Sequence, residues 1–240
     1  MESTKTFQNL EIPLKNTISS IKYIYLVVDT SGSTNKILPV FKKYIAEFIG
    51  NLKKIDNSMV YISIVTYSEK PHLTLPLTNV KEVNCNSLVY PNAIGATYTG
   101  GALIGTVNMA MKTYKERKSI EKEYKVFSPL VILFSDGKLC PGLNATNDDI
   151  ERCYSDYNKA CESIKSYEHN SYADELTFIA VALKGTVGNA EIDELRKLSS
   201  HNDRVVEITD TKSLYSLFQS CVYFTVHNTF PSDDYKQLEF

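Results

Sequence analysis

The sequence predicts an α/β fold with a doubly wound, mostly parallel sheet, helices on both faces and one antiparallel strand at an edge. Short apolar, β-branched segments alternate with longer segments of helical period, which is typical of such folds. The apolar segments are nearly continuous in Val, Ile, Leu, Phe and Tyr, as in strands that are buried on both faces. The chain has 240 residues, 43% of them hydrophobic, which is enough for one domain with a substantial core.

Five segments are expected to form the buried strands, namely residues 21–29, 58–68, 127–135, 175–183 and 204–208. A sixth segment, residues 72–77, follows the second strand after only three residues, too few for a helical crossover. We therefore expect it to pair antiparallel at the edge of the sheet, where Pro76 can be tolerated.

Helices are expected between the strands. Apolar residues recur at steps of three and four over residues 38–52, with Pro39 in the first turn. Similar stripes predict helices over residues 102–114, 150–164, 191–198 and 214–223. Residues 115–125 mix both charge signs and are expected to form a solvated helix end and a loop. The inward stripe of the third helix is expected to hold Ile150, Cys153, Tyr154, Tyr157, Cys161 and Ile164. The domain is thus expected over residues 21–226, between an N-terminal segment, 1–20, and a tail, 227–240.

Composition excludes several classes of function. The net charge is −2, so no broad basic field is present for nucleic acid or an anionic membrane. No apolar run approaches the roughly 20 residues of a membrane-spanning helix, and the first 15 residues do not resemble a secretion signal. The five cysteines have neither disulfide-like nor zinc-like spacing, so we expect reduced thiols and a cytoplasmic protein.

Three polar loops are expected at the carboxyl-end rim of the sheet. Asp29, Ser31 and Ser33 follow the first strand at alternate positions, Thr97 lies in a glycine-rich loop before the second helix, and Asp136 ends a later strand. Carboxylates and hydroxyls are hard oxygen ligands of the kind Mg²⁺ or Mn²⁺ takes, and no thiolate or imidazole is available for zinc. These five residues are therefore predicted to bind one divalent cation.

The proportion of neutral to charged ligands predicts that a partner protein completes the site. Neutral hydroxyls donate weakly and two carboxylates at most cancel the charge of the ion, so the cation would stay electrophilic toward an outside anion. We expect an Asp or Glu of a partner protein to complete the coordination, with Tyr98, Lys138 and Leu139 as the surrounding contact residues.

These motifs resemble the von Willebrand factor A domain with its metal-ion-dependent adhesion site. The family pattern is Asp-x-Ser-x-Ser, a Thr-x-Thr-Gly loop and an Asp-Gly after an apolar strand. In this chain the three motifs begin at Asp29, Thr97 and Asp136, respectively. The resemblance implies that Ser31, Ser33 and Thr97 contact the ion and that Asp29 and Asp136 act directly or through water. Ser135 stands where the family more usually has Thr.

Within that family the chain is similar to the bacterial TerY-like proteins, through the segments YLVVDTSGS, VYISIVTYS, LPLTNV, GATYTGGAL and PLVILFSDG. This resemblance implies a cytoplasmic scaffold in a phosphorylation system for stress, tellurium resistance or phage defence. The implied partners are a kinase or a phosphatase of the same gene cluster.

Other interpretations of the same residues stay open. Each polar loop taken alone could be a helix cap or a turn. We expect no enzymatic activity, because a magnesium-dependent phosphatase of the haloacid-dehalogenase type needs Asp-x-Asp, and Ser31 occupies the second position. Two alternatives remain: a structural subunit with a vestigial metal site, and a magnesium-dependent phosphatase-like enzyme.

Overall fold

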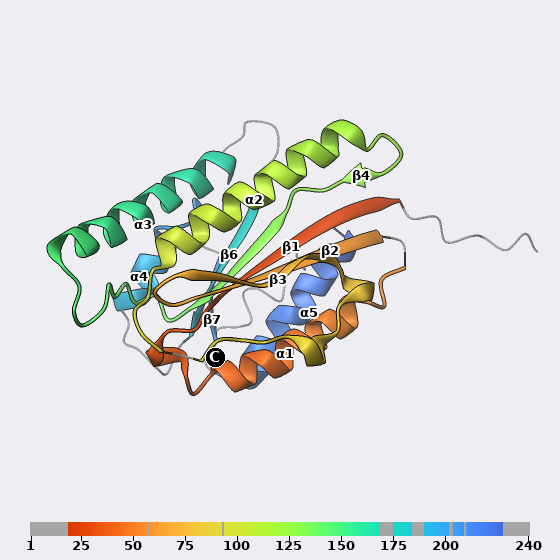
Figure 1. The fold of residues 1–240 in the computed structure, drawn as a ribbon. Helices are drawn as coiled ribbons and strands as arrows, with labels where there is room; N and C mark the ends of the chain where they lie inside the picture. Colours follow the sequence, from red (N-terminus) through yellow and green to blue (C-terminus); the bar gives the residue numbers. More distant parts are fainter. Residues whose placement is uncertain are drawn as a thin grey trace, which may run out of the picture.

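The computed structural model describes residues 19–56, 58–92, 94–168, 175–183, 190–201, 204–208 and 210–227. It contains a seven-stranded sheet of order β3-β2-β1-β5-β6-β7, with the short strand β4 paired to β1 (Figure 1). The parallel strands are β1 (Ser20–Asp29), β2 (Ser58–Tyr67), β4 (Lys125–Val126), β5 (Leu130–Ser135), β6 (Thr177–Leu183) and β7 (Val205–Ile208). The predicted fold class is confirmed. Nearly all of the N-terminal segment and of the tail lies outside the described residues.

The antiparallel edge strand is β3 (Pro71–Asn79), which pairs only with β2 among the described strands. Its register shifts between Ile62 and Val65 of β2, so the strand bulges where Pro76 falls. A proline cannot donate a ladder hydrogen bond, and an edge strand with a bulge accommodates it.

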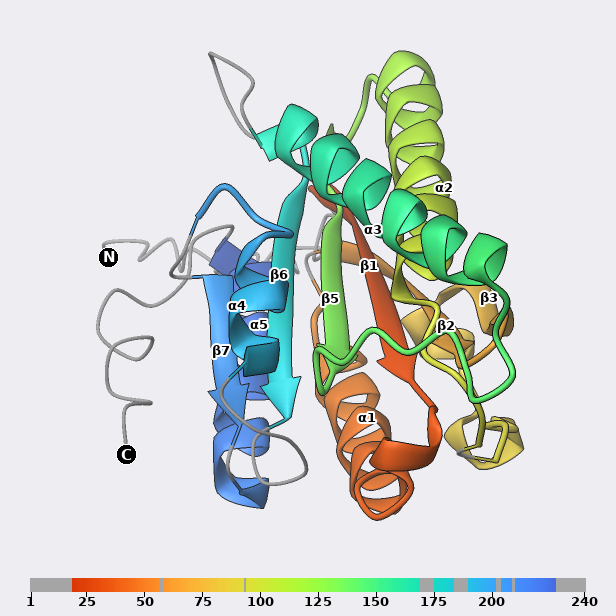
Figure 2. The same cartoon turned by 90° about the vertical axis from the view of Figure 1, so that its left-hand side faces the viewer.

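Helices cover both faces of the sheet (Figure 2). One face carries α1 (Leu38–Leu52) and α5 (Thr211–His227), and the other carries α2 (Thr99–Ile120), α3 (Asn147–Glu168) and α4 (Ala190–Arg196). Along β1, Leu26 and Val28 pack toward the first face and Tyr25 and Val27 toward the second, as the alternation of a strand requires. None of the helices in the described ranges is both long and apolar enough to cross a membrane.

Several element ends differ from the sequence expectation. Helix α2 begins at Thr99 and continues through the charged residues to Ile120, and part of the expected loop forms β4. In α3 the prediction of an inward Ile150 and Tyr154 is wrong, because they are 39% and 50% exposed. Tyr154 lies about 100° around the helix from the buried Cys153 and so turns away from the sheet, while Ile150 lies in the first turn.

The arrangement of strands creates a switch point between β1 and β5. The chain moves outward from β1 to β2 and β3, and in the opposite direction from β5 to β6 and β7. Val28 pairs with Phe134, so Asp29 ends level with Ser135 at the carboxyl edge of both strands. In open α/β sheets this crevice is where ligands bind.

Candidate functional site

Asp29 is the last residue of β1 and its side chain is fully buried. Its Oδ1 accepts a hydrogen bond from the Ser31 backbone N–H at 2.8 Å, and its Oδ2 accepts one from Ser135 Oγ at 3.0 Å. The carboxylate is therefore held from both sides and links the ends of β1 and β5.

The loop after β1 is shaped by threonine side chains. Thr30 donates to the Tyr67 carbonyl from its N–H at 2.7 Å and from its hydroxyl at 2.9 Å. Thr34 Oγ1 lies 3.0 Å from the Asp29 carbonyl and 2.9 Å from the Ser31 carbonyl, in the short 3₁₀ turn Gly32–Thr34. These hydrogen bonds hold the loop so that Ser31 Oγ and Ser33 Oγ lie 3.1 Å apart, with Ser31 buried and Ser33 exposed.

Asp136 follows β5 and is 4% exposed. Its Oδ1 accepts the Lys138 N–H at 3.0 Å, and the turn passes through Gly137 at φ 77°, a conformation that favours glycine. Its Oδ2 is buried and has no hydrogen-bond partner. A buried carboxylate oxygen without a partner is costly, so this atom is chemically suited to bind a cation or to accept a further hydrogen bond.

Backbone hydrogen bonds join the three predicted loops into one rim. The Ile94 N–H donates to the Thr30 carbonyl at 3.1 Å, and the Thr97 N–H donates to the Cys140 carbonyl at 2.7 Å. Thr97 itself is 3% exposed. The five side chains that the sequence predicts as metal ligands thus come from loops that contact one another.

The electrostatics of the rim favour a cation. Burial raises the pKa of Asp29 to about 7; the hydrogen bond from the Ser31 N–H opposes this rise, and the charge of Asp136 adds to it. Within the described part of the chain, neither carboxylate forms an ion pair with a Lys, Arg or His. Two buried carboxylates without a positive partner are stable together only when a cation or protons neutralise them.

The donor set fits a magnesium-class ion. Among the described residues, no group of three or more His, Cys, Asp or Glu surrounds a metal position, so a bound ion would have two carboxylates at most. Mg²⁺ commonly takes one or two carboxylates and fills its remaining positions with neutral oxygens and water. Asp29, Asp136 and the hydroxyls of Ser31, Ser33 and Thr97 match that description.

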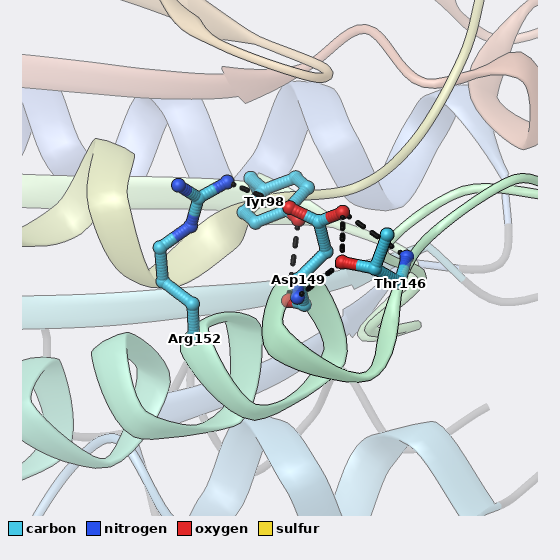
Figure 3. Close-up of polar contacts among 4 residues, drawn as sticks. All are labelled: Tyr98, Thr146, Asp149 and Arg152. Atoms are coloured by element: carbon cyan, nitrogen blue, oxygen red, sulfur yellow. Dashed lines mark hydrogen bonds and ion pairs between the residues drawn. The ribbon is translucent and has the colours of Figure 1, made fainter.

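Tyr98 is tied to the start of α3 (Figure 3). Its hydroxyl donates to the Asp149 carbonyl at 3.3 Å, and the Arg152 guanidinium lies 5.8 Å from the centre of its ring. Arg152 also pairs with Asp149 at 3.1 Å. Thr146 Oγ1 caps this helix end by accepting the Asp149 N–H at 3.2 Å, and its hydroxyl donates to the other Asp149 oxygen at 2.7 Å. Tyr98, which follows Thr97 in the chain, is therefore anchored to α3.

The three residues predicted to contact a partner differ in exposure. Lys138 is exposed at the rim, Tyr98 is half-buried against α3, and Leu139 is half-buried and packs partly against the core beneath α2 and α3. The side chain of Lys138 is thus more available to a partner than those of Tyr98 and Leu139.

Some residues of the rim are not predicted from the sequence as part of the site. Ser135 donates to Asp29 and accepts the Gly137 N–H at 3.0 Å, so it joins both carboxylate loops. The resemblance to the family marks its position, where Thr is more usual, but assigns it no role in the site. Thr34 and Arg152 act through contacts that appear only once the chain is folded, and no motif marks them.

Known proteins resemble this chain in family and in fold. Residues 24–220 match the von Willebrand factor type A domain. Among curated protein sequences none matches the chain. The pilus adhesin SpaC of Lactobacillus rhamnosus GG, in its open conformation, is 12% identical with a TM-score of 0.62, covering 87% of this chain and 30% of the adhesin.

Two further structures show the same fold. A von Willebrand factor type A protein from Catenulispora acidiphila is 19% identical with a TM-score of 0.52, over 85% of this chain and 42% of that one. The von Willebrand factor domain of the type V pili tip protein Mfa5 from Porphyromonas gingivalis is 13% identical with a TM-score of 0.55. The match covers 90% of this chain and 98% of that domain. The chain thus spans less than half of the first two proteins, and such identities show the fold alone. With the family match over most of its length, the chain belongs to the von Willebrand factor type A domain family.

Proposed function

We propose that this protein is a metal-dependent protein-binding module whose cation lies between Asp29 and Asp136. The single observation that carries the proposal is Asp136 Oδ2, a buried carboxylate oxygen without a hydrogen-bond partner beside a second buried carboxylate. Mg²⁺ or Mn²⁺ would supply the missing positive charge at this place.

The protein side chains would leave room for an outside ligand. Ser31, Ser33 and Thr97 contribute neutral oxygens, so the two carboxylates provide all the negative charge the chain offers to the ion. When bound, the ion supplies a hard Lewis-acidic position that an Asp or Glu of a partner can occupy. Of the proposed ligands, Ser33 is exposed, and Lys138 beside Asp136 is exposed as well, so a partner would approach the ion from the side of these two residues.

A role in binding fits the family better than a role in catalysis. SpaC is a pilus adhesin and Mfa5 is a pili tip protein, and both carry this fold. The hydrogen bonds to Asp29 come from the Ser31 N–H and the Ser135 hydroxyl, and no histidine or cysteine is among these partners to act as a general base beside a nucleophile. We therefore propose that the rim binds and does not catalyse.

The narrower assignment rests on the TerY-like segments of the sequence. We propose a cytoplasmic scaffold in a bacterial stress, tellurium-resistance or phage-defence phosphorylation system, with a kinase or phosphatase as the partner that presents the acidic side chain. No role with nucleic acid or membrane is proposed, because the net charge of −2 provides no basic field for either.

Calorimetric titration with Mn²⁺ and Mg²⁺ tests the metal site. Wild type should bind one ion, and Asp29→Asn and Asp136→Asn should each lower the affinity at least tenfold, since each removes one of two charged ligands. Asp193→Asn is the matched control, because Asp193 is an exposed α4 carboxylate paired only with Arg196 in the described residues. Equal affinity in all four proteins would contradict the proposal, and absence of binding by wild type would favour the vestigial site.

A further inference from the structure

Tyr67, the last residue of β2, contacts the segments that carry all three parts of the candidate metal site. Its side chain is fully buried, in the core that β1 and β5 share with α2 and α3. Its backbone carbonyl accepts the Thr30 N–H at 2.7 Å and the Thr30 hydroxyl at 2.9 Å, and Thr30 stands between Asp29 and Ser31. The end of β2 therefore holds the first ligand loop.

The hydroxyl of Tyr67 joins the other two segments. It accepts a hydrogen bond from the Thr99 hydroxyl at 3.3 Å, and Thr99 begins α2 two residues after Thr97. It also hydrogen-bonds to Ser135, the residue before Asp136. Because the phenol accepts from Thr99, its own proton is free to be donated to the Ser135 hydroxyl.

Ser135 connects this phenol to the carboxylate of Asp29. The Ser135 hydroxyl donates to Asp29 Oδ2 at 3.0 Å and accepts the Gly137 N–H at 3.0 Å. A hydroxyl has one proton and two lone pairs, so a second accepted bond, from Tyr67, keeps the Ser135 proton directed at Asp29. Hydrogen bonds linked in this way strengthen one another.

The phenol of Tyr67 stays a donor at neutral pH. Burial raises its pKa well above the usual value, and the negative charges of Asp29 and Asp136 add to this rise. A neutral donor at this place suits a metal site, where groups behind the ligands hold them in position by hydrogen bonds.

We infer that the Tyr67 hydroxyl is a positioning group for the proposed metal site. Through Ser135 it holds the Asp29 carboxylate in a single orientation. This inference rests on the proposed function, because the carboxylate that it orients is a ligand of the proposed cation. It assigns a role to a residue outside the three metal-ligand motifs of the sequence.

Calorimetric titration of the full chain with Mn²⁺ tests the inference. Tyr67→Phe removes only the hydroxyl and leaves the ring and the backbone contacts with Thr30 in place. The affinity for Mn²⁺ should fall about tenfold, since losing a hydrogen bond that orients a metal ligand commonly costs roughly 10- to 100-fold in affinity.

Tyr157→Phe is the matched control. Tyr157 is also buried, and its hydroxyl donates to the Glu194 carbonyl of α4 at 2.6 Å, a partner outside the three ligand loops. Urea unfolding in EDTA should show a loss of stability in both variants, whereas only Tyr67→Phe should lose affinity for Mn²⁺. The comparison separates positioning of the site from general destabilisation.

A second comparison tests whether Tyr67 acts through Ser135. In Ser135→Ala the hydroxyl that links the phenol to Asp29 is absent. Adding Tyr67→Phe to this variant should therefore lower the Mn²⁺ affinity by less than about twofold more, because residues that act through one contact have non-additive effects.

Equal Mn²⁺ affinity in wild type and Tyr67→Phe would overturn the inference while the metal site itself stands. An equal loss of affinity in Tyr157→Phe would overturn it too, since general destabilisation would then explain the effect. So would a full tenfold further loss in the Ser135→Ala background. Absence of Mn²⁺ binding by wild type would instead refute the proposed function, and the inference with it.

Discussion

Strand β1 carries a buried ionisable side chain near each end. Asp29 closes the carboxyl end beneath the candidate metal site, and Lys22, 5% exposed, lies near the amino end. The Lys22 ammonium is 3.4 Å from the Phe224 carbonyl of α5 and 4.2 Å from the centre of the Phe127 ring. Burial, with a smaller contribution from Lys125, lowers the pKa of Lys22 to about 8. Both groups thus oppose folding in their charged forms.

Lys22→Met should stabilise the protein at neutral pH. Below pH 8 the amine is protonated in both states, and the folded state bears the full cost of burying the charge. Between pH 8 and 10.5 the folded protein releases its proton first, so wild-type stability rises with pH and the advantage of the variant shrinks. The difference should be at most about 3 kcal/mol, since one pKa unit corresponds to about 1.4 kcal/mol.

Urea unfolding of both proteins from pH 6 to 10.5 measures this difference. The exposed Lys125→Met is the control and should give a smaller gain. A variant less stable than wild type at pH 7 would show that the contacts of Lys22 outweigh its desolvation. A difference independent of pH would show that folding does not lower the pKa of Lys22.

At the scale of elements, the site depends on how closely α2 approaches α3. A Cβ on Gly100 would lie 2.3 Å from the Tyr157 backbone nitrogen, closer than atoms can come. The same helix end bears Thr99, whose hydroxyl donates to the Tyr67 hydroxyl at 3.3 Å, and follows the anchored Tyr98. The glycine thus lets α2 begin directly after the loop that carries Thr97.

Gly100→Ala should therefore destabilise the protein while Gly101→Ala should not. The first change forces the helices apart and is expected to cost about 1–3 kcal/mol, as overpacked sites do. The second meets no atom within 4 Å and should stabilise α2 by up to about 1 kcal/mol, because alanine favours helix more than glycine. Urea denaturation of the two variants compares them directly, and equal stabilities would contradict the close packing.

The same helix shows why element ends are harder to predict than elements. The apolar stripe from residue 102 predicts α2, but the helix starts at Thr99 because packing on α3 overrides the poor helix propensity of Gly100 and Gly101. Strand β4 has only two residues and is a strand because it pairs with β1, so no local sequence pattern could predict it.

For the whole molecule, most of the fold and the grouping of the candidate site follow from the pattern of strands. Parallel strands end at the same edge, so residues as distant as Asp29 and Asp136 are predicted to meet, and the Ser135 hydroxyl joins their strands. Side-chain details that depend on tertiary contacts could not be predicted. They include the half-buried Tyr98 against Arg152 and the exposed Leu143 beside the rim.

The anomalous signal of Mn²⁺ in a crystal of this protein tests the central claim most directly. The account predicts one strong peak between the carboxylates of Asp29 and Asp136, within bonding distance of the Ser31, Ser33 and Thr97 hydroxyls or of waters they hold. The peak should vanish in Asp29→Asn crystals grown in the same way. A crystal grown with saturating Mn²⁺ that shows no peak at this rim, or whose strongest peak lies elsewhere on the chain, would contradict the metal site.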